Sequence, residues 1–252
     1  MISIIIPVLN ESATIGHLIR HLNASSTSSN ITEIIIVDGG STDGTLDIIR
    51  PFRFLKPERS ADKKSDSEIN SGLANPSKVI LIDSPKGRAK QMNFGAKQAC
   101  GSILYFLHAD SFPPKHFDQL ILSEVEKGNK AGCFRMQFES NHWWLCLASW
   151  FTQFNWKACR GGDQSLFITQ ELFNIIGGYN EAYGIYEDNI LIQELYQRKQ
   201  FTVINKKLQT SARLYKKHGV WKVQYHYFRI YIKRWFGASA EDLQKYYRKY
   251  FS

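Results

Sequence analysis

The sequence predicts an α/β fold in which a mostly parallel central sheet is flanked by helices and followed by a helical C-terminal extension. Over about the first 110 residues, short apolar runs of strand length alternate with segments of helical periodicity. This alternation is typical of parallel strands joined by helices that cover both faces of a sheet. The chain has 252 residues, 43% hydrophobic and 22% charged, so it can form one globular domain with a large core.

The first predicted strand covers residues 2–9, a continuous apolar run of the kind that is buried on both faces of a sheet. A helix is predicted to follow, because apolar residues recur at helical spacing across 15–22. Asn10 or Ser12 is the candidate N-cap of this helix. The β-branched run at 33–37 predicts the second strand.

The next elements continue the alternation. The Gly-, Ser- and Thr-rich segment 39–44 is predicted to be a loop, and a helix is predicted through 46–49. Residues from about 56 to 78 are polar, of mixed charge and poor in apolar side chains, which predicts a surface insertion. A third strand is expected at 79–83, and a helix at 87–100.

The fourth strand is predicted at 103–108. Pro113-Pro114 is expected to open a helix that runs to about Lys127, since proline is tolerated in a first helical turn. Further on, the pattern predicts an aromatic-rich helix at 143–156 and a short strand at 165–168.

The C-terminal residues 216–252 are expected to form a basic, aromatic helical tail packed on the preceding domain, residues 1–215. From Lys206 onward twelve Lys and Arg residues stand against two acidic residues, so the net charge of +9 is concentrated there. Basic and aromatic residues occur together in helices packed on a core, in surfaces that contact anionic membranes and in nucleic-acid sites. We favour packed helices or peripheral membrane contact, and expect no nucleic-acid partner.

Polar side chains gather where the four predicted parallel strands end. In open α/β sheets, ligands bind outside the carboxyl ends of the strands. Any one of these residues could simply cap the following helix, but four such groups at one edge exceed what solubility requires. The residues concerned are Asn10, Glu11, Asp38, Asp83, His108 and Asp110.

Three groups of residues indicate chemistry. Asp110 follows a predicted buried strand and lies beside His108, where a carboxylate can hold Mg²⁺ or Mn²⁺ over a diphosphate that completes the coordination shell. Glu187 and Asp188 open a predicted helix, where acids either stabilise the first turn or supply a general base. The run Gly161-Gly162-Asp163-Gln164 offers close backbone approach and polar recognition.

Taken together, these motifs resemble family 2 glycosyltransferases of the GT-A fold over roughly residues 1–215. The joint match is specific, because the motifs occur in the right order along the chain. The matching segments are 3–11 with its Pro-x-x-Asn-Glu turn, 37–45 at the V-D-D-G-S-x-D-G-T loop, 87–96 at the helix before the metal strand, His108-Ala109-Asp110 at the D-x-D motif, and Glu187-Asp188 at the E-D motif.

The resemblance implies inverting transfer of one sugar from a UDP- or GDP-sugar to a small-molecule or lipid-linked acceptor, with Mg²⁺ or Mn²⁺ as cofactor. It implies that Asp188 is the catalytic base and that Asp110 binds the metal. The implied nucleotide-sugar-binding residues are Pro7, Asn10, Glu11, Asp38, Arg88, Gln91 and His108. The implied acceptor-binding residues are Gly162, Asp163, Gln164 and Glu187.

Two positions depart from the family pattern. Gly39 replaces the second Asp of the V-D-D loop, and His108 replaces the first Asp of D-x-D. The His-Ala-Asp form, with Gly-Gly-Asp-Gln later in the chain, resembles a bacterial subfamily often linked to arsenosugar biosynthesis. The Q-x-x-R-W motif of processive synthases is absent around Arg234-Trp235, so transfer of a single sugar is expected.

Two other classes of function share parts of this pattern. One is a catalytically degenerate protein that only binds nucleotide sugars, against which the presence of both Asp110 and Asp188 argues. The other is a nucleotidyltransferase, which would carry a Gly-rich phosphate loop after the first strand, where this chain has Pro-Val-Leu-Asn-Glu.

The remaining features concern the cellular location. The N-terminus lacks a basic n-region, and the sequence has no run of about 18 apolar residues, so neither a signal peptide nor a membrane span is expected. The four cysteines are widely spaced without a C-x-x-C pair, which predicts buried, reduced thiols. A cytoplasmic location is expected, with peripheral contact at the inner membrane face as the alternative that the tail leaves open.

Overall fold

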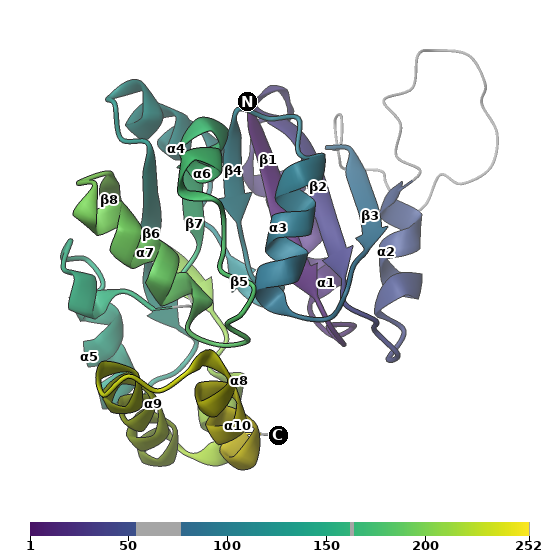
Figure 1. Cartoon of the computed structure of the whole chain (residues 1–252). Helices are drawn as coiled ribbons and strands as arrows, with labels where there is room; N and C mark the ends of the chain where they lie inside the picture. Colours follow the sequence, from purple (N-terminus) through teal and green to yellow (C-terminus); the bar gives the residue numbers. More distant parts are fainter. Residues whose placement is uncertain (54–76, 162–163, 252) are drawn as a thin grey trace, which may run out of the picture.

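A computed structural model describes residues 1–53, 77–161 and 164–251 (Figure 1). Its centre is one eight-stranded sheet with the order β3-β2-β1-β4-β7-β6-β8-β5. The strands are β1 (Ile2–Val8), β2 (Ile31–Asp38), β3 (Val79–Asp83), β4 (Ile103–Phe106), β5 (Ser111–Phe112), β6 (Ala131–Phe138), β7 (Leu166–Thr169) and β8 (Phe201–Thr210).

Helices cover both faces of this sheet and one of its edges. The α-helices are α1 (Ile15–Ser25), α2 (Thr45–Arg53), α3 (Arg88–Gln98), α4 (Phe117–Glu126), α5 (Trp143–Phe151), α6 (Gln170–Ile176), α7 (Glu187–Gln197), α8 (Arg213–His218), α9 (Val220–Trp235) and α10 (Ala240–Phe251). Two single turns of 3₁₀ helix, η1 (Ser28–Asn30) and η2 (Lys157–Cys159), complete the described elements.

The predicted parallel sheet is confirmed in the N-terminal half. Strand β1 pairs in parallel with β2 and with β4, and β2 pairs in parallel with β3. The C-terminal half is mixed: β7 runs antiparallel to β4 and β6, β8 runs parallel to β6, and the short β5 runs antiparallel to β8. The carboxyl ends of β1 and β4 therefore lie side by side near the middle of the sheet, as a ligand site requires.

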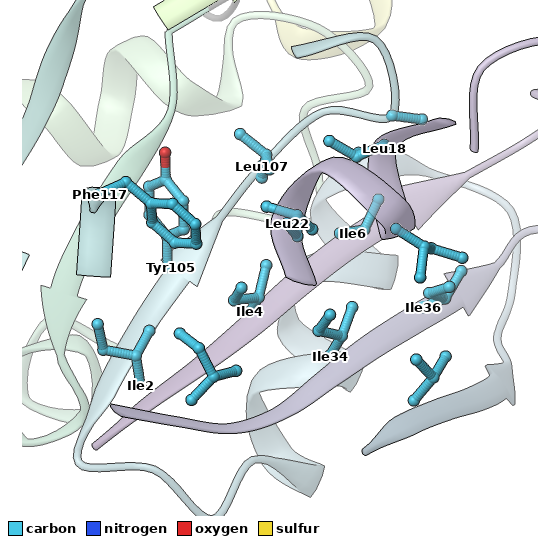
Figure 2. Close-up of a cluster of buried hydrophobic side chains, with 14 of the residues drawn as sticks. Ile2, Ile4, Ile6, Leu18, Leu22, Ile34, Ile36, Tyr105, Leu107 and Phe117 are labelled. Carbon is cyan, nitrogen blue, oxygen red and sulfur yellow. The ribbon is translucent and has the colours of Figure 1, made fainter. Parts of the chain in front are cut away.

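Strand β1 is buried on both faces, which explains its unbroken apolar sequence. Ile4 and Ile6 point to one side and pack with Leu18 and Leu22 of α1 (Figure 2). Ile5 points to the other side of the sheet and belongs to the apolar cluster that α3 covers. Burying one such side chain contributes about 1.5–3 kcal/mol, so this strand is a main anchor of the fold.

The C-terminal helices gather at the edge of the sheet where the parallel strands end (Figure 1). They close over a third apolar cluster that joins β6, α5, α8, α9 and α10. Its buried members are Met136, Phe138, Leu145, Ala212, Tyr215, Val223 and Phe251. Helices α8 to α10 thus form a wall opposite the ends of β1 and β4.

Several details differ from the sequence-based expectations. The first helix has Thr14 as its N-cap, without a side-chain hydrogen bond, rather than Asn10 or Ser12. Helix α4 begins at Phe117, after a His116 cap at φ 58°, so Pro113-Pro114 precede it instead of forming its first turn. The aromatic helix α5 stops at Phe151.

Two further expectations concern the cysteines and the polar insertion. All four cysteines are free, but Cys100 and Cys146 are exposed, so the prediction that the thiols are buried was wrong for these two. Cys133 is buried, and burial raises its pKa. The insertion predicted at about 56–78 lies almost wholly outside the described residues.

Candidate active site

A cleft of about 1100 Å³ opens at the carboxyl ends of the strands. Its walls come from the ends of β1, β4, β6 and β8, from α5 and the start of α7, and from the C-terminal helices. Eight of the residues that the sequence singled out line it, although they come from distant parts of the chain. They are Pro7, Glu11, Arg88, Gln91, His108, Asp110, Gln164 and Asp188.

One end of the cleft holds a pair of carboxylates around a single guanidinium. Arg213, at the start of α8, donates to both carboxylate oxygens of Glu11 at 2.8 and 3.0 Å. Its Nη2 also lies 3.5 Å from Asp110 Oδ2. The hydrogen bonds to Glu11 raise the pKa of Arg213, so this cation stays charged. Glu11 and Asp110, which lie in the segments after β1 and β4, therefore share one cation position.

A second guanidinium organises the other acidic pair. Arg88 Nε donates to Glu187 Oε1 at 2.5 Å, and Arg88 Nη2 lies 3.5 Å from Asp188 Oδ2. Glu187 is fully buried and is not part of the cleft wall, whereas Asp188 lines it. Glu187 thus holds Arg88 in place from the buried side, away from the cleft. Arg88 and Asp188 both line the cleft.

The backbone before this pair adopts an uncommon conformation. Tyr186 caps α7 at φ 73°, a left-handed conformation that costs a non-glycine residue energy and is concentrated at functional sites. The Tyr186 ring packs edge-on against Tyr231 of α9, with centroids 5.4 Å apart. The C-terminal tail therefore holds the turn that presents Asp188.

Asn10 and Asp38 fasten the loop between β2 and α2 to the end of β1. The Asp38 carboxylate accepts hydrogen bonds from the backbone N–H groups of Gly40 and Ser41, at 2.8 and 3.0 Å. Asn10 Oδ1 accepts one from Thr42 at 2.8 Å. Neither Asn10 nor Asp38 belongs to the cleft wall, so the structure shows both shaping the loop beside it.

Gln91 explains one departure from the family pattern. Its Nε2 donates to the carbonyl oxygens of Val8 and Val37, both at 2.8 Å, and so ties the ends of β1 and β2 together. A Cβ atom at Gly39 would lie 3.1 Å from the Gln91 carboxamide. The glycine that stands in place of the second Asp therefore leaves room for Gln91.

Gln164 lines the cleft, but its carboxamide is used inside the protein. Its Oε1 accepts from Arg160 at 2.9 Å, and its Nε2 donates to the Cys159 carbonyl at 2.9 Å. Only 7% of Gln164 is exposed, so it stabilises this segment. Gly162 and Asp163, the other two residues of this predicted acceptor group, lie outside the described residues.

The cleft has two chemically distinct parts. The strand-end side is charged, with Glu11, Arg88, Asp110, Asp188 and Arg213 in its wall. The side formed by β6 and the helices is rich in apolar and aromatic side chains. That part includes Met136, Phe138, Phe151, Tyr215, Tyr227, Ile230, Tyr247 and Phe251. Such a division suits a charged ligand on one side and an apolar one on the other.

The charged side fits a divalent cation that a diphosphate helps to hold. Within the described ranges, no three His, Cys, Asp or Glu side chains form a ready metal site. Glu11 and Asp110 nevertheless face one cation position, and carboxylate oxygens suit Mg²⁺ and Mn²⁺. These ions usually take several ligands from water and substrate phosphates, so two carboxylates are enough to position one.

Arg213 was not identified from the sequence as a site residue. It is one of twelve cations in the basic C-terminal stretch, and nothing in its neighbours distinguishes it. Its place follows from β8, which ends at Thr210 beside β5 and returns the chain to Asp110. The Ser211 N–H donates to the Asp110 carbonyl at 3.3 Å, which brings Arg213 to the carboxylates.

Comparison with known proteins now identifies the class. A family model described as glycosyl transferase family 2 matches residues 3–180, which is more than half of the chain. The chain belongs to glycosyl transferase family 2. This match covers Asp38 at the end of β2, and Glu11 and Asp110 in the segments that follow β1 and β4.

Curated relatives are more distant. The chain is 29% identical over 199 residues to a PGL/p-HBAD biosynthesis glycosyltransferase of Mycobacterium bovis, covering 75% of this chain and 66% of the relative. It is 26% identical over 203 residues to the succinoglycan biosynthesis protein ExoA of Rhizobium meliloti, covering 73% and 54%. It is 29% identical over 112 residues to glycosyltransferase AglE of Haloferax volcanii, covering 44% of this chain and 31% of that protein. The chain thus spans about a third to two thirds of these proteins' lengths.

Solved structures support the fold. S. aureus TarS, residues 1–349 in complex with UDP, superposes with a TM-score of 0.64 at 16% identity, covering 84% of this chain and 60% of that TarS chain. The mannosyltransferase PcManGT of Pyrobaculum calidifontis, in complex with GDP-Man and Mn²⁺, gives 0.63 at 16% identity, covering 91% and 59%. The GT-A-type fold expected from the sequence is therefore confirmed, with a mixed sheet and C-terminal helices.

Proposed function

We propose that this protein is a glycosyltransferase that moves one sugar from a nucleotide-diphosphate sugar to an acceptor hydroxyl, with inversion at the anomeric carbon. One observation carries the proposal. Asp110 and Asp188, separated by 78 positions in the sequence, line one cleft at the ligand-binding edge of the sheet, with Arg88 and Arg213 beside them. Carboxylates and guanidinium groups so placed can hold a diphosphate and accept a proton.

The charged side of the cleft is the proposed donor site. Pro7, Arg88 and His108 line it, and Asn10, Asp38 and Gln91 hold its loops in place. A UDP- or GDP-sugar is the expected donor, because two proteins of similar fold are described with UDP and with GDP-Man. Asp110, with Glu11 nearby, would hold Mg²⁺ or Mn²⁺, as a complex of one neighbour with Mn²⁺ supports.

The metal would neutralise charge on the departing diphosphate, and the remaining steps fall to the protein's own groups. Asp188 takes the proton from the acceptor hydroxyl, whose oxygen attacks the anomeric carbon as the bond to the diphosphate breaks. Arg88 and Arg213 stabilise the developing phosphate charge, since guanidinium groups match phosphate oxygens in geometry. Glu187 contributes indirectly, because it keeps Arg88 in position.

The finer assignments rest on narrower support. Transfer of a single sugar rests on the absence of the Q-x-x-R-W motif around Arg234-Trp235. Membership of the arsenosugar-linked subfamily rests on the His108-Ala109-Asp110 motif together with Gly-Gly-Asp-Gln. Either a small molecule or a lipid-linked molecule could fill the apolar side of the cleft as acceptor. A cytoplasmic location is proposed because nucleotide sugars are expected there. Among the described residues, none of the helices has the length and hydrophobicity of a membrane span.

The test is turnover of a panel of UDP- and GDP-sugars with Mn²⁺, following release of the nucleoside diphosphate by mass spectrometry. Water can replace the acceptor in this assay, so the acceptor need not be known. We expect one donor to raise the melting temperature and to be turned over. Asp188→Asn should lower that rate by about 10²- to 10⁴-fold while leaving the thermal shift intact, because a general base acts mainly in the transition state.

Glu194→Gln is the matched control, since Glu194 lies on the same helix in an exposed ion pair with Arg198. It should leave both turnover and the thermal shift unchanged. A donor that stabilises the wild-type protein without any turnover would favour the degenerate binding protein instead. Loss of donor binding in Asp188→Asn would remove Asp188 from the role of base.

A further inference from the structure

Two neighbouring helices of the C-terminal region leave apolar stripes facing solvent. On α9, the exposed residues Trp221, Tyr225, Phe228 and Trp235 recur every three, four or seven positions, so they lie on one side of the helix. The opposite side of α9 buries Val223, His226 and Ile230. This helix therefore has a second apolar stripe that the core does not use.

Helix α5 adds a similar stripe. Trp143, Leu147 and Trp150 are exposed and lie three or four positions apart, while Leu145 is buried. The two stripes meet at one point, where the rings of Trp143 and Trp221 lie 5.8 Å apart. We name these exposed residues of α5 and α9 the aromatic face. Large apolar side chains that are exposed side by side on two adjoining helices are typical of an interaction site.

The positive charge around the aromatic face favours an anionic partner. Helices α5 and α9 contain no Asp or Glu, whereas α9 carries Lys222, Arg229, Lys233 and Arg234. A second copy of this chain, docked about a twofold axis, would bring these cations against one another. Aromatic rings together with Lys and Arg, on an amphipathic helix, are instead typical of contact with an anionic membrane interface.

The same two helices form part of the cleft. Ala148 and Phe151 of α5 line it, as do Tyr227, Ile230 and Tyr231 of α9. Phe151 and Tyr231 are also exposed, so the apolar side of the cleft is continuous with the outer surface of these helices. In Figure 1, α5 and α9 lie next to each other at the end of the molecule beyond the strand ends.

We propose that the aromatic face binds the surface of an anionic membrane and thereby presents the apolar side of the cleft to an acceptor anchored in that membrane. The membrane-binding part of this inference does not depend on the proposed function. Only the statement that the cleft takes a sugar acceptor rests on it. The acceptor class is then a hydroxyl-bearing molecule on a long apolar chain. The apolar chain of the acceptor would remain in the lipid, while the acceptor's polar head enters between α5 and α9.

The test uses the whole chain and vesicles of phosphatidylcholine, alone or mixed with phosphatidylglycerol. The wild-type protein should float with the mixed vesicles and bind much less to phosphatidylcholine alone. The double variant Phe228→Glu/Trp235→Glu should bind the mixed vesicles at least about tenfold more weakly, because it places charge where apolar rings enter the interface. Phe228 and Trp235 are 63% and 86% exposed, so the fold should tolerate both changes.

Ile175→Glu is the matched control, because Ile175 is an apolar residue on α6 that is 58% exposed and lies outside the aromatic face. It should leave vesicle binding unchanged. Brominated lipids provide a second readout on the wild-type protein, whose tryptophan fluorescence they should quench. Donor-induced thermal shift, measured without vesicles, reports on the proposed function separately.

Three results would overturn the proposal. The first is wild-type protein that ignores the mixed vesicles while still responding to a nucleotide-sugar donor. The second is an equal loss of binding in Ile175→Glu. The third is vesicle-free self-association that the double variant abolishes, which would assign the aromatic face to a second copy of the chain.

Discussion

Arg213 and Asp110 mark the point where the strand-end acids and the C-terminal helices meet. The Arg213 guanidinium donates to Glu11 through both Nη1 and Nη2, and Nη2 also reaches Asp110. An incoming diphosphate can take over the guanidinium's donors, which leaves the two carboxylates available for a divalent cation. In the proposed donor site, this one cation would therefore change partners when the diphosphate binds.

This arrangement predicts opposite dependences on metal for two variants. Arg213→Met should weaken binding of UDP or GDP by about tenfold even without Mn²⁺, since a charge-assisted hydrogen bond is lost. Asp110→Ala should instead abolish the gain in affinity that Mn²⁺ gives. Isothermal titration with and without Mn²⁺ measures both effects.

Two controls accompany this measurement. Arg50→Met removes an exposed arginine that pairs with Asp47 on the same helix, and Asp83→Asn removes a strand-end acid that is not part of the cleft wall. Both should bind UDP or GDP as the wild type does. Unchanged Mn²⁺ dependence in Asp110→Ala would exclude Asp110 from the metal site.

The sequence predicted some site residues better than others. Glu11, Asp110 and Asp188 could be found because they follow predicted strands or open a predicted helix, and Pro7 and Arg88 could be found from the family resemblance. All five line the cleft. Arg213, which pairs with Glu11 and Asp110, could not be found in the same way. Whether a conspicuous polar side chain faces the cleft or supports a loop depends on hydrogen bonds between distant segments.

At the scale of elements, a buried arginine holds the segment between α5 and β7. Arg160 is 4% exposed and donates to the carbonyl oxygens of Thr152 and Phe154 at 2.6 and 2.7 Å. It also donates to Gln164 and to Cys133 Sγ. These bonds turn the chain away after α5, which accounts for a helix shorter than its aromatic sequence predicts.

Arg160→Met should therefore lower the free energy of unfolding by about 3 kcal/mol, because it leaves buried carbonyl oxygens without donors. Chemical denaturation followed by circular dichroism measures this change. Arg198→Met is the control: Arg198 forms an exposed ion pair with Glu194 one helical turn away, worth less than about 0.5 kcal/mol. Equal losses in the two variants would contradict a structural role for the Arg160 network.

The two halves of the sheet were not equally predictable. Strands β1, β2, β3 and β4 have apolar runs that identify them, and the structure confirms all four. Strand β8 contains Asn205-Lys206-Lys207 and is exposed there, so its sequence does not resemble a buried strand. It pairs with β6 through a register shift at Phe134/Arg135, an interaction that only the folded chain reveals.

At the scale of the whole molecule, the C-terminal helices complete the site that the N-terminal sheet begins. Tyr231 of α9 reaches the Asn189 side chain at 3.4 Å, and Arg234 lies over the Tyr183 ring at 5.6 Å. Gln244 of α10 packs so closely on Gly184 that a Cβ atom there would lie 2.3 Å from it. The turn carrying Asp188 is thus supported by helices that lie outside the segment matched by the family.

A crystal structure of the protein with Mn²⁺ and either UDP or GDP tests the central claim most directly. We predict that the diphosphate lies in the cleft between Arg88 and Arg213, with the metal ion bound to Asp110 and the Asp188 carboxylate facing the position of the donor sugar. A nucleotide bound on another surface, or one bound in the cleft with Asp110 and Asp188 on opposite sides away from the phosphates, would contradict this account.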